Sequence, residues 1–143
     1  MKTIKQILSE KTKPLTTMQP GDTVQSAMEL MRDRGIGAVI VVQGGKLVGI
    51  FSERDCLNKV SSIGRNPWET KVRDVMTTKV HYVTLDTEVS QGLALMTERF
   101  LRHLPVLDEK QNILGIVSIG DLVKAKIADQ SFTIEQLERY ITS

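Results

Sequence analysis

The stretch Gly49-Ile-Phe-Ser-Glu-Arg-Asp55 decides the fold, because a matching stretch, Gly115-Ile-Val-Ser-Ile-Gly-Asp121, follows it 66 residues later. Upstream of both stretches the match continues at an offset of 65, with Val24 on Val89. Self-similarity at a fixed spacing indicates that one supersecondary unit has been duplicated. We therefore predict two copies of the same unit in this chain.

Hydrophobic periodicity and turn residues predict the order β-α-β-β-α in each copy. In the first copy, Asp22 is the expected N-cap and Gly35 the expected stop of the first helix. The elements expected in the first copy are an extended piece at 15–18, a helix at 23–34, strands at 38–42 and 47–51, and a helix at 53–60. The elements expected in the second copy are an extended piece at 82–85, a helix at 88–100, strands at 104–107 and 113–117, and a helix at 119–128. The fold class is α+β, with small sheets packed against helices in a pseudo-two-fold arrangement.

Segments outside the copies complete the predicted organisation. The expected regions are a lead-in at 1–12 with a short helix at Thr3–Glu10, the first repeat at 13–61, a linker at 62–79 with one helical turn, the second repeat at 80–129, and a C-terminal helix at 130–143. Thr133 and Gln136 have the spacing of a capping box ahead of that last helix. We expect it to dock on the body; the alternative is a detachable helix that binds a partner.

Composition excludes several classes of protein. The chain has 143 residues, 41% of them hydrophobic and 25% charged, with a net charge of +2, which is too balanced for a nucleic-acid coat. The longest aliphatic run, Ala38 to Val42, is far too short to span a membrane. A single cysteine, Cys56, excludes an intrachain disulfide, and the two histidines lack the spacing of a zinc site. We therefore expect a cytoplasmic protein without a metal.

The duplicated motif resembles a tandem pair of CBS domains, the repeats that form a Bateman module. The Arg102-His-Leu-Pro-Val106 and Val72–Thr77 (VRDVMT) stretches carry the same resemblance, which covers about Lys13 to Asp129. It implies binding of AMP, ADP, ATP, NAD or S-adenosylmethionine between the repeats, regulation of a partner protein, and pairing into a homodimer. The first copy departs from the pattern, because Ala38-Val-Ile-Val41 stands where the second has His103-Leu-Pro-Val106.

Two serine–aspartate pairs are the strongest candidates for the binding site. Ser52 with Asp55, and Ser118 with Asp121, lie where a strand ends and a helix begins. One interpretation is a capping box, which satisfies backbone N–H groups without any ligand. The other is binding, because a helix start suits phosphate and a carboxylate can accept two hydrogen bonds from a ribose diol. The two interpretations are compatible.

Further candidates surround these pairs. Arg102 and His103 in the second copy, and Arg54 in the first, are either surface residues or groups that bind phosphate. The remaining candidates are hydrogen-bonding threonines, apolar contacts for adenine and positions of close backbone approach: Thr17, Thr84, Ile119, Pro105 and Gly37.

The hypothesis with the most support is a non-catalytic sensor that requires no cofactor and binds an adenine nucleotide as its ligand. An enzyme is disfavoured, because no nucleophile and base are paired and Asp55 and Asp121 lie in separate repeats. The alternative is an interaction scaffold with degenerate sites. A sensor of this size needs a separate effector protein, which would distinguish two populated states of the module.

Overall fold

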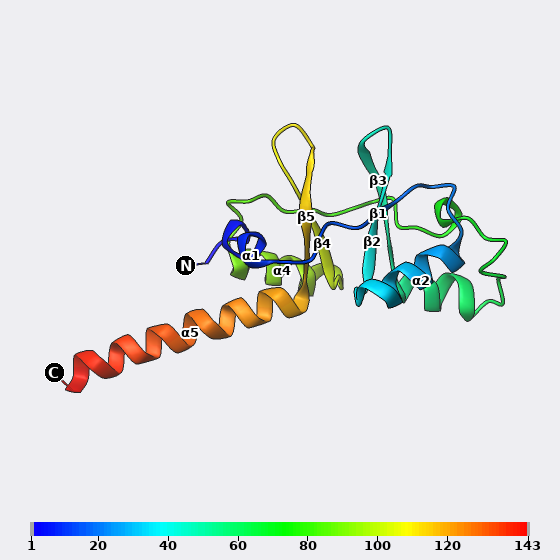
Figure 1. The fold of residues 1–143 in the computed structure, drawn as a ribbon. Coiled ribbons are helices and arrows are strands. Elements are labelled where there is room, and N and C mark those ends of the chain that lie inside the picture. Colours follow the sequence, from blue (N-terminus) through cyan, green and yellow to red (C-terminus); the bar gives the residue numbers. More distant parts are fainter. Residues whose placement is uncertain (1, 143) are drawn as a thin grey trace. The chain divides into compact units, whose positions relative to one another are not determined.

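The duplication predicted from the sequence is present in the computed structural model, which describes residues 2–142 (Figure 1). The chain divides into two units, Pro14–Val80 and Met1–Lys13 with His81–Ser143. Each unit has its own buried cluster of apolar side chains. Helices and two small sheets confirm the α+β class.

The sheet of the unit Pro14–Val80 has the strand order β1-β2-β3. Strand β1 (Thr17–Met18) pairs in parallel with β2 (Ala38–Gln43), and β2 pairs antiparallel with β3 (Lys46–Ser52). Gly44 and Gly45 form the β2–β3 turn with φ values of 59° and 77°, a conformation that glycine adopts without strain. The predicted hairpin is therefore confirmed.

Helix α2 (Val24–Arg34) covers this sheet and begins one residue later than its predicted cap implied. The N-cap is Thr23 and not Asp22, because the Thr23 hydroxyl accepts the backbone N–H of Ser26 at 3.1 Å. The Asp22 carboxylate instead accepts the backbone N–H of Gln19 at 2.9 Å, so it closes the preceding turn. Gly35 ends the helix in the left-handed region, as predicted.

The second helix of this unit is shorter than predicted. Helix α3 (Glu53–Cys56) gives way to a wider π-helical turn at Leu57–Ser61. The backbone N–H of Ser62 donates to the carbonyl of Leu57 at 3.0 Å, five residues back. Within this turn Val60 is buried in the core, while Lys59 stays half-exposed beside α3.

The other unit contains α1 (Ile4–Glu10), α4 (Val89–Arg99), β4 (His103–Leu107), β5 (Ile113–Ser118) and α5 (Ile119–Thr142). Strands β4 and β5 form an antiparallel pair, and Val83 adds a parallel bridge to Val106 where an extended piece was predicted. Phe100 ends α4 with a φ of 56°, the left-handed position that Gly35 occupies in the first copy. A phenylalanine there costs about 1 kcal/mol relative to glycine.

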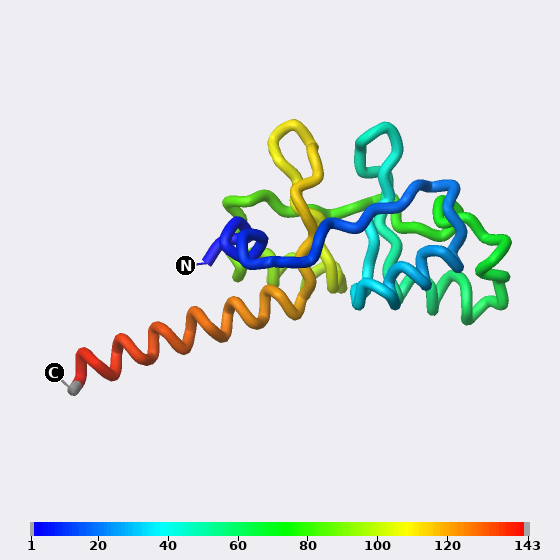
Figure 2. The backbone as a smooth tube through the Cα atoms, viewed as in Figure 1, coloured from blue at the N-terminus to red at the C-terminus, as the bar shows by residue number. Residues whose placement is uncertain are grey.

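The two copies exchange the segments that cover their sheets. The linker ahead of the second repeat lies on the sheet of the first repeat, and α1, ahead of the first repeat, lies on the sheet of the second. In the unit Pro14–Val80, Met76 lies over Gly49, and Thr77 exchanges backbone hydrogen bonds of 2.9 and 3.0 Å with Ile50. In the other unit, Leu8 of α1 lies over Gly115, the counterpart of Gly49. Figure 2 shows α1, the blue helix at the N-terminus, beside the strand β5. A Cβ atom at Gly49 or Gly115 would come within 3.0 Å of these covering side chains, so glycine leaves room for the cover at both positions.

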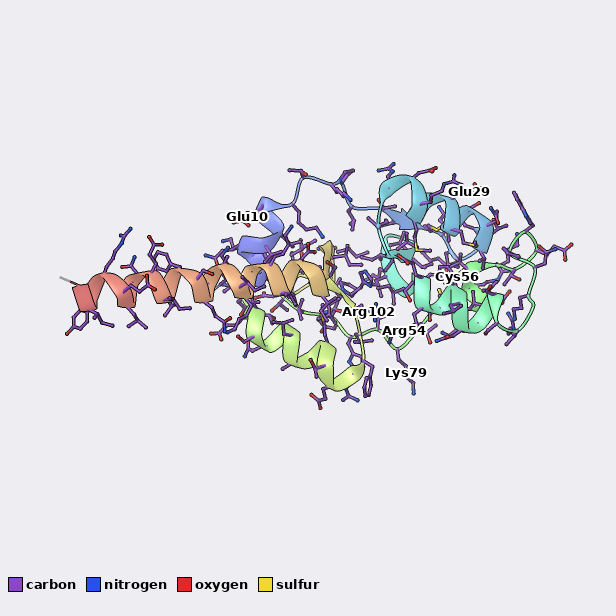
Figure 3. All side chains as sticks on the ribbon, turned by 90° about the horizontal axis from the view of Figure 1, so that it is seen from below. Glu10, Glu29, Arg54, Cys56, Lys79 and Arg102 are labelled. Atoms are coloured by element: carbon purple, nitrogen blue, oxygen red, sulfur yellow. The ribbon has the colours of Figure 1, made fainter. Side chains whose placement is uncertain are left out.

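The C-terminal region differs from the prediction. Residues 119–128 and 133–142 form one continuous helix, α5, because no glycine or proline after Gly120 interrupts it. The hydroxyl of Thr133 donates to the carbonyl of Asp129 at 3.1 Å, so it does not cap a new helix. The outer part of α5 projects from its unit, with residues 130–141 exposed (Figures 1 and 3). The predicted docking on the body is therefore wrong.

Candidate functional site

The first candidate pair, Ser52 and Asp55, forms a complete capping box at the start of α3. The Asp55 carboxylate accepts the backbone N–H of Ser52 at 3.0 Å and its hydroxyl at 3.1 Å. The Ser52 hydroxyl in turn accepts the backbone N–H of Asp55 at 3.2 Å. The structural interpretation of this pair is thus confirmed.

Two further donors bind the other oxygen of Asp55. The Lys59 ammonium lies 3.0 Å from Oδ1, and the Thr77 hydroxyl donates to the same atom at 3.2 Å. The side chain of Asp55 is only 12% exposed. A buried carboxylate needs such partners, because an unpaired charge in the interior is costly. Both oxygens of Asp55 are therefore engaged within their own unit.

The second pair, Ser118 and Asp121, has the same local geometry at the start of α5. Oδ2 of Asp121 accepts the backbone N–H of Ser118 at 2.9 Å, and the Ser118 hydroxyl accepts the backbone N–H of Asp121 at 3.1 Å. Lys11 donates to the same Oδ2 at 2.9 Å and to the carbonyl of Ile116 at 2.9 Å. Among the described residues, none donates to Oδ1, and the Asp121 side chain is 27% exposed.

The environment of Asp121 favours its charged form. Burial raises the pKa of the carboxyl group, but the hydrogen bond from Lys11, the donors of Ser118 and the lysine charge lower it by more. The net pKa lies below the ordinary value. Lys11 therefore keeps Asp121 ionised and ready to accept hydrogen bonds.

Replacing Lys11 with methionine is expected to lower the free energy of unfolding at pH 7 by about 1 kcal/mol, because Asp121 loses its cation. The ionic part of this loss is present above the unfolded pKa of about 3.9 and disappears as the pH falls through the lower folded pKa. Urea unfolding at several pH values between 7 and 3 measures the difference between wild type and variant. The difference should narrow below about pH 4.

The matched control for that experiment is Lys5→Met, which removes an exposed lysine from α1, the helix that ends directly before Lys11. Asp86 and Asp108 also have lowered pKa values. Both residues are present in every variant, so their contribution to the pH dependence of stability cancels when the variants are compared. An unchanged difference between pH 7 and pH 3 would contradict the role assigned to Lys11.

Backbone hydrogen bonds place several other predicted residues. The backbone N–H of Glu53 donates to the carbonyl of Gly37 at 3.0 Å, and that of Ile119 donates to the carbonyl of Arg102 at 2.8 Å. These bonds are equivalent in the two copies. Each joins the first residue of a helix, α3 or α5, to the residue directly before a strand, β2 or β4. Arg54 and Arg102 both have exposed side chains, and Figure 3 labels them.

The remaining candidates differ in how far their side chains are exposed. Thr17 is exposed in β1, whereas Pro105 is buried in β4, where its carbonyl accepts the backbone N–H of Val83 at 3.0 Å. The Thr84 hydroxyl donates to the carboxylate of Asp86 within a turn. His103 begins β4 with a partly buried side chain.

Lysines beside the two aspartates are the main residues that sequence reasoning missed. Lys59 could have been found, since it follows Asp55 by four residues, the spacing of a helical ion pair. Lys11 had no local signal, because 110 residues separate it from Asp121. Within residues 2–142 no cluster of histidine, cysteine, aspartate or glutamate could hold a metal ion, and no helix could cross a membrane.

Comparison with known proteins identifies the duplicated unit. The family model described as CBS domain matches residues 4–62 and 72–128. The chain is 40% identical over 125 residues to the mitochondrial CBS domain-containing protein CBSX3 of Arabidopsis thaliana, in a match that covers 84% of this chain and 60% of that protein. The chain thus spans less than two thirds of that relative.

Solved structures agree with this match. A protein with CBS domains from Burkholderia ambifaria MC40-6 is 44% identical, with a TM-score of 0.85, over 90% of this chain and 96% of that one. The CBS domain pair of protein MJ0100, solved with 5′-methylthioadenosine and S-adenosyl-L-methionine, shares the fold at 22% identity and a TM-score of 0.78, over 90% of this chain and 98% of that one.

Proposed function

Because the chain belongs to the CBS domain family and carries two copies of the domain, we propose that it is a non-catalytic regulatory module that binds an adenine nucleotide. The ligand is AMP, ADP, ATP or NAD. Its occupancy shifts the population of conformations, and a separate effector protein reads that shift. The adenosine part of this proposal is supported by MJ0100, which has the same fold and was solved with two adenosine compounds.

The Asp121 carboxylate is the observation that carries the proposal. Its Oδ2 is fixed by Ser118 and Lys11, which orient the group, while its Oδ1 accepts no hydrogen bond from the described residues. A ribose diol presents two hydroxyl donors, which an oriented carboxylate can accept. We therefore assign Asp121 to the ribose, and the side chains of Arg102 and His103 to the phosphate.

The copy that contains Asp55 is the weaker site in this proposal. Ser52, Thr77 and Lys59 already supply donors to both oxygens of that carboxylate. A ligand there would have to replace internal hydrogen bonds, which reduces the net gain from binding. Arg54, Gly37 and Thr17 stay candidates at this weaker site, as Ile119, Pro105 and Thr84 do at the stronger one.

Thermal unfolding with a panel of ligands tests the proposal. AMP, ADP, ATP, NAD, NADH and S-adenosylmethionine are each added to the wild type, to Asp121→Ala, and to Glu109→Ala, which removes an exposed negative charge from the same unit. A ligand at about 100 times its Kd stabilises the folded state by about 2.7 kcal/mol, or several degrees. We expect such a shift in the wild type and the Glu109 variant, and its loss in the Asp121 variant.

The outcome also decides between two functions. If no nucleotide shifts the wild-type midpoint, the chain is an interaction scaffold, the alternative favoured by the internally engaged Asp55 and by Ala38–Val41 in the first copy. If a nucleotide stabilises Asp121→Ala as much as the wild type, the protein binds nucleotide but the ribose assignment is wrong.

A further inference from the structure

An apolar stripe follows one face of α5 along most of its length. Five of its members are Val123, Ile127, Ile134, Leu137 and Ile141, with exposed fractions of 40%, 58%, 56%, 57% and 79%. Gln130 is the sixth position and is the stripe's only polar member. Burying these side chains would be favourable, because each keeps a large apolar surface in water.

The spacing of the stripe alternates between four and three residues, which is the heptad pattern of a coiled coil. Ile127, Ile134 and Ile141 take the a positions, and Val123, Gln130 and Leu137 take the d positions. This face differs from the one that packs on the body. Leu122 and Ala125 of α5 are buried in the core of the unit, and at 100° per residue they point about 100° and about 160° away from the middle of the stripe.

We propose that this stripe pairs with the same stripe of a second copy of the chain, as an antiparallel two-helix coiled coil. In that register each a residue meets a d residue of the second copy. Val123 packs on Ile141, Ile127 on Leu137, and Gln130 on Ile134. The proposal rests on α5 alone and is independent of nucleotide binding.

Charge complementarity selects the second copy and its antiparallel direction. The e positions of α5 include Lys124 and Glu138, and an antiparallel pair places Lys124 of one copy opposite Glu138 of the other, twice. At the centre of the pair, Ser131 and Thr133 each face the same residue of the other copy. Both are uncharged, so no like charges meet there. A parallel pair would instead place Lys126 by Ser131 and Thr133 by Glu138, without any opposite charges.

Gln130 limits the stability of this pairing. It would lie opposite Ile134 in the two layers that flank the centre of the pair. A polar side chain in an apolar seam lowers stability, because its amide leaves water without gaining a hydrogen-bond partner across the seam. We therefore expect a reversible dimer.

Light scattering at micromolar protein, without any nucleotide, tests the pairing. The wild type should have at least twice the mass of one chain, and Ile134→Asp should have half the wild-type mass. Phe132→Asp is the matched control, because Phe132 is similarly exposed, at 61% against 56%, but lies on the opposite side of the helix. A single-chain mass for the wild type, or an unchanged mass for Ile134→Asp, would overturn the proposal.

A charge exchange tests the direction. Lys124→Glu alone and Glu138→Lys alone each create two like-charged pairs, and each should raise the dimer dissociation constant at least about threefold. The double variant restores opposite charges and should return to within about twofold of wild type. Failure of the double variant to recover would overturn the antiparallel register, and circular dichroism checks that every variant is folded.

Discussion

Replacing Phe51 with alanine lowers the free energy of unfolding by about 4 kcal/mol, the largest loss expected for a single change in this protein. Phe51 lies in β3 with no exposed surface. Its ring belongs to the buried cluster of the unit Pro14–Val80, which contains residues of β1, α2 and β2 and of the linker at 72–75. Truncation removes the ring's burial and leaves a cavity that these elements can fill only in part.

Urea unfolding followed by circular dichroism measures this loss. The control is Trp68→Ala, which removes another large aromatic side chain from the same unit, but one that is 67% exposed. It should cost less than about 1 kcal/mol. A loss below about 2 kcal/mol for Phe51→Ala would mean that the core around β3 rearranges or is less closely packed than the structure indicates.

Asp55→Ala is expected to have the second largest effect, a loss of about 3 kcal/mol. The change deletes an acceptor for Ser52 and Thr77 and leaves the Lys59 ammonium without its carboxylate. Because Lys59 is 43% exposed, it can turn to water, so the loss falls at the low end for a broken buried ion pair.

Asp55→Asn separates the two contributions to that loss. Its amide oxygen can still accept the capping hydrogen bond but carries no charge for Lys59, so about half of the loss should remain. Asp121→Ala should cost less than Asp55→Ala, because Asp121 is more exposed and only one of its oxygens accepts hydrogen bonds from described residues. Equal losses at the two aspartates, measured by urea unfolding, would contradict this ranking.

Local signals predicted most of the elements. The two glycines of the β2–β3 turn, the stop at Gly35 and the serine–aspartate spacing at the starts of α3 and α5 are all short-range features, and each is where the sequence indicated. The error at Asp22 has the same origin. Asp22 and Thr23 are adjacent and both suit an N-cap, so their order could not be decided from residue preference alone.

Long-range contacts could not be predicted in this way. Lys11 reaches Asp121, and Leu8 covers Gly115, because α1 lies against β5 of the second copy. No periodicity within α1 encodes that choice. The continuity of α5 was missed for a different reason: the spacing of Thr133 and Gln136 imitates a helix start, yet nothing between the two halves ends the first helix.

Titration calorimetry of the best-bound nucleotide against its 2′,3′-dideoxy analogue tests the central claim most directly, because the two ligands differ only in the ribose diol assigned to Asp121. The account predicts that the wild type binds the analogue at least about tenfold more weakly, a loss of about 1.4 kcal/mol. It also predicts that Asp121→Ala binds both ligands equally weakly. Equal affinity of the wild type for the two ligands would contradict the account.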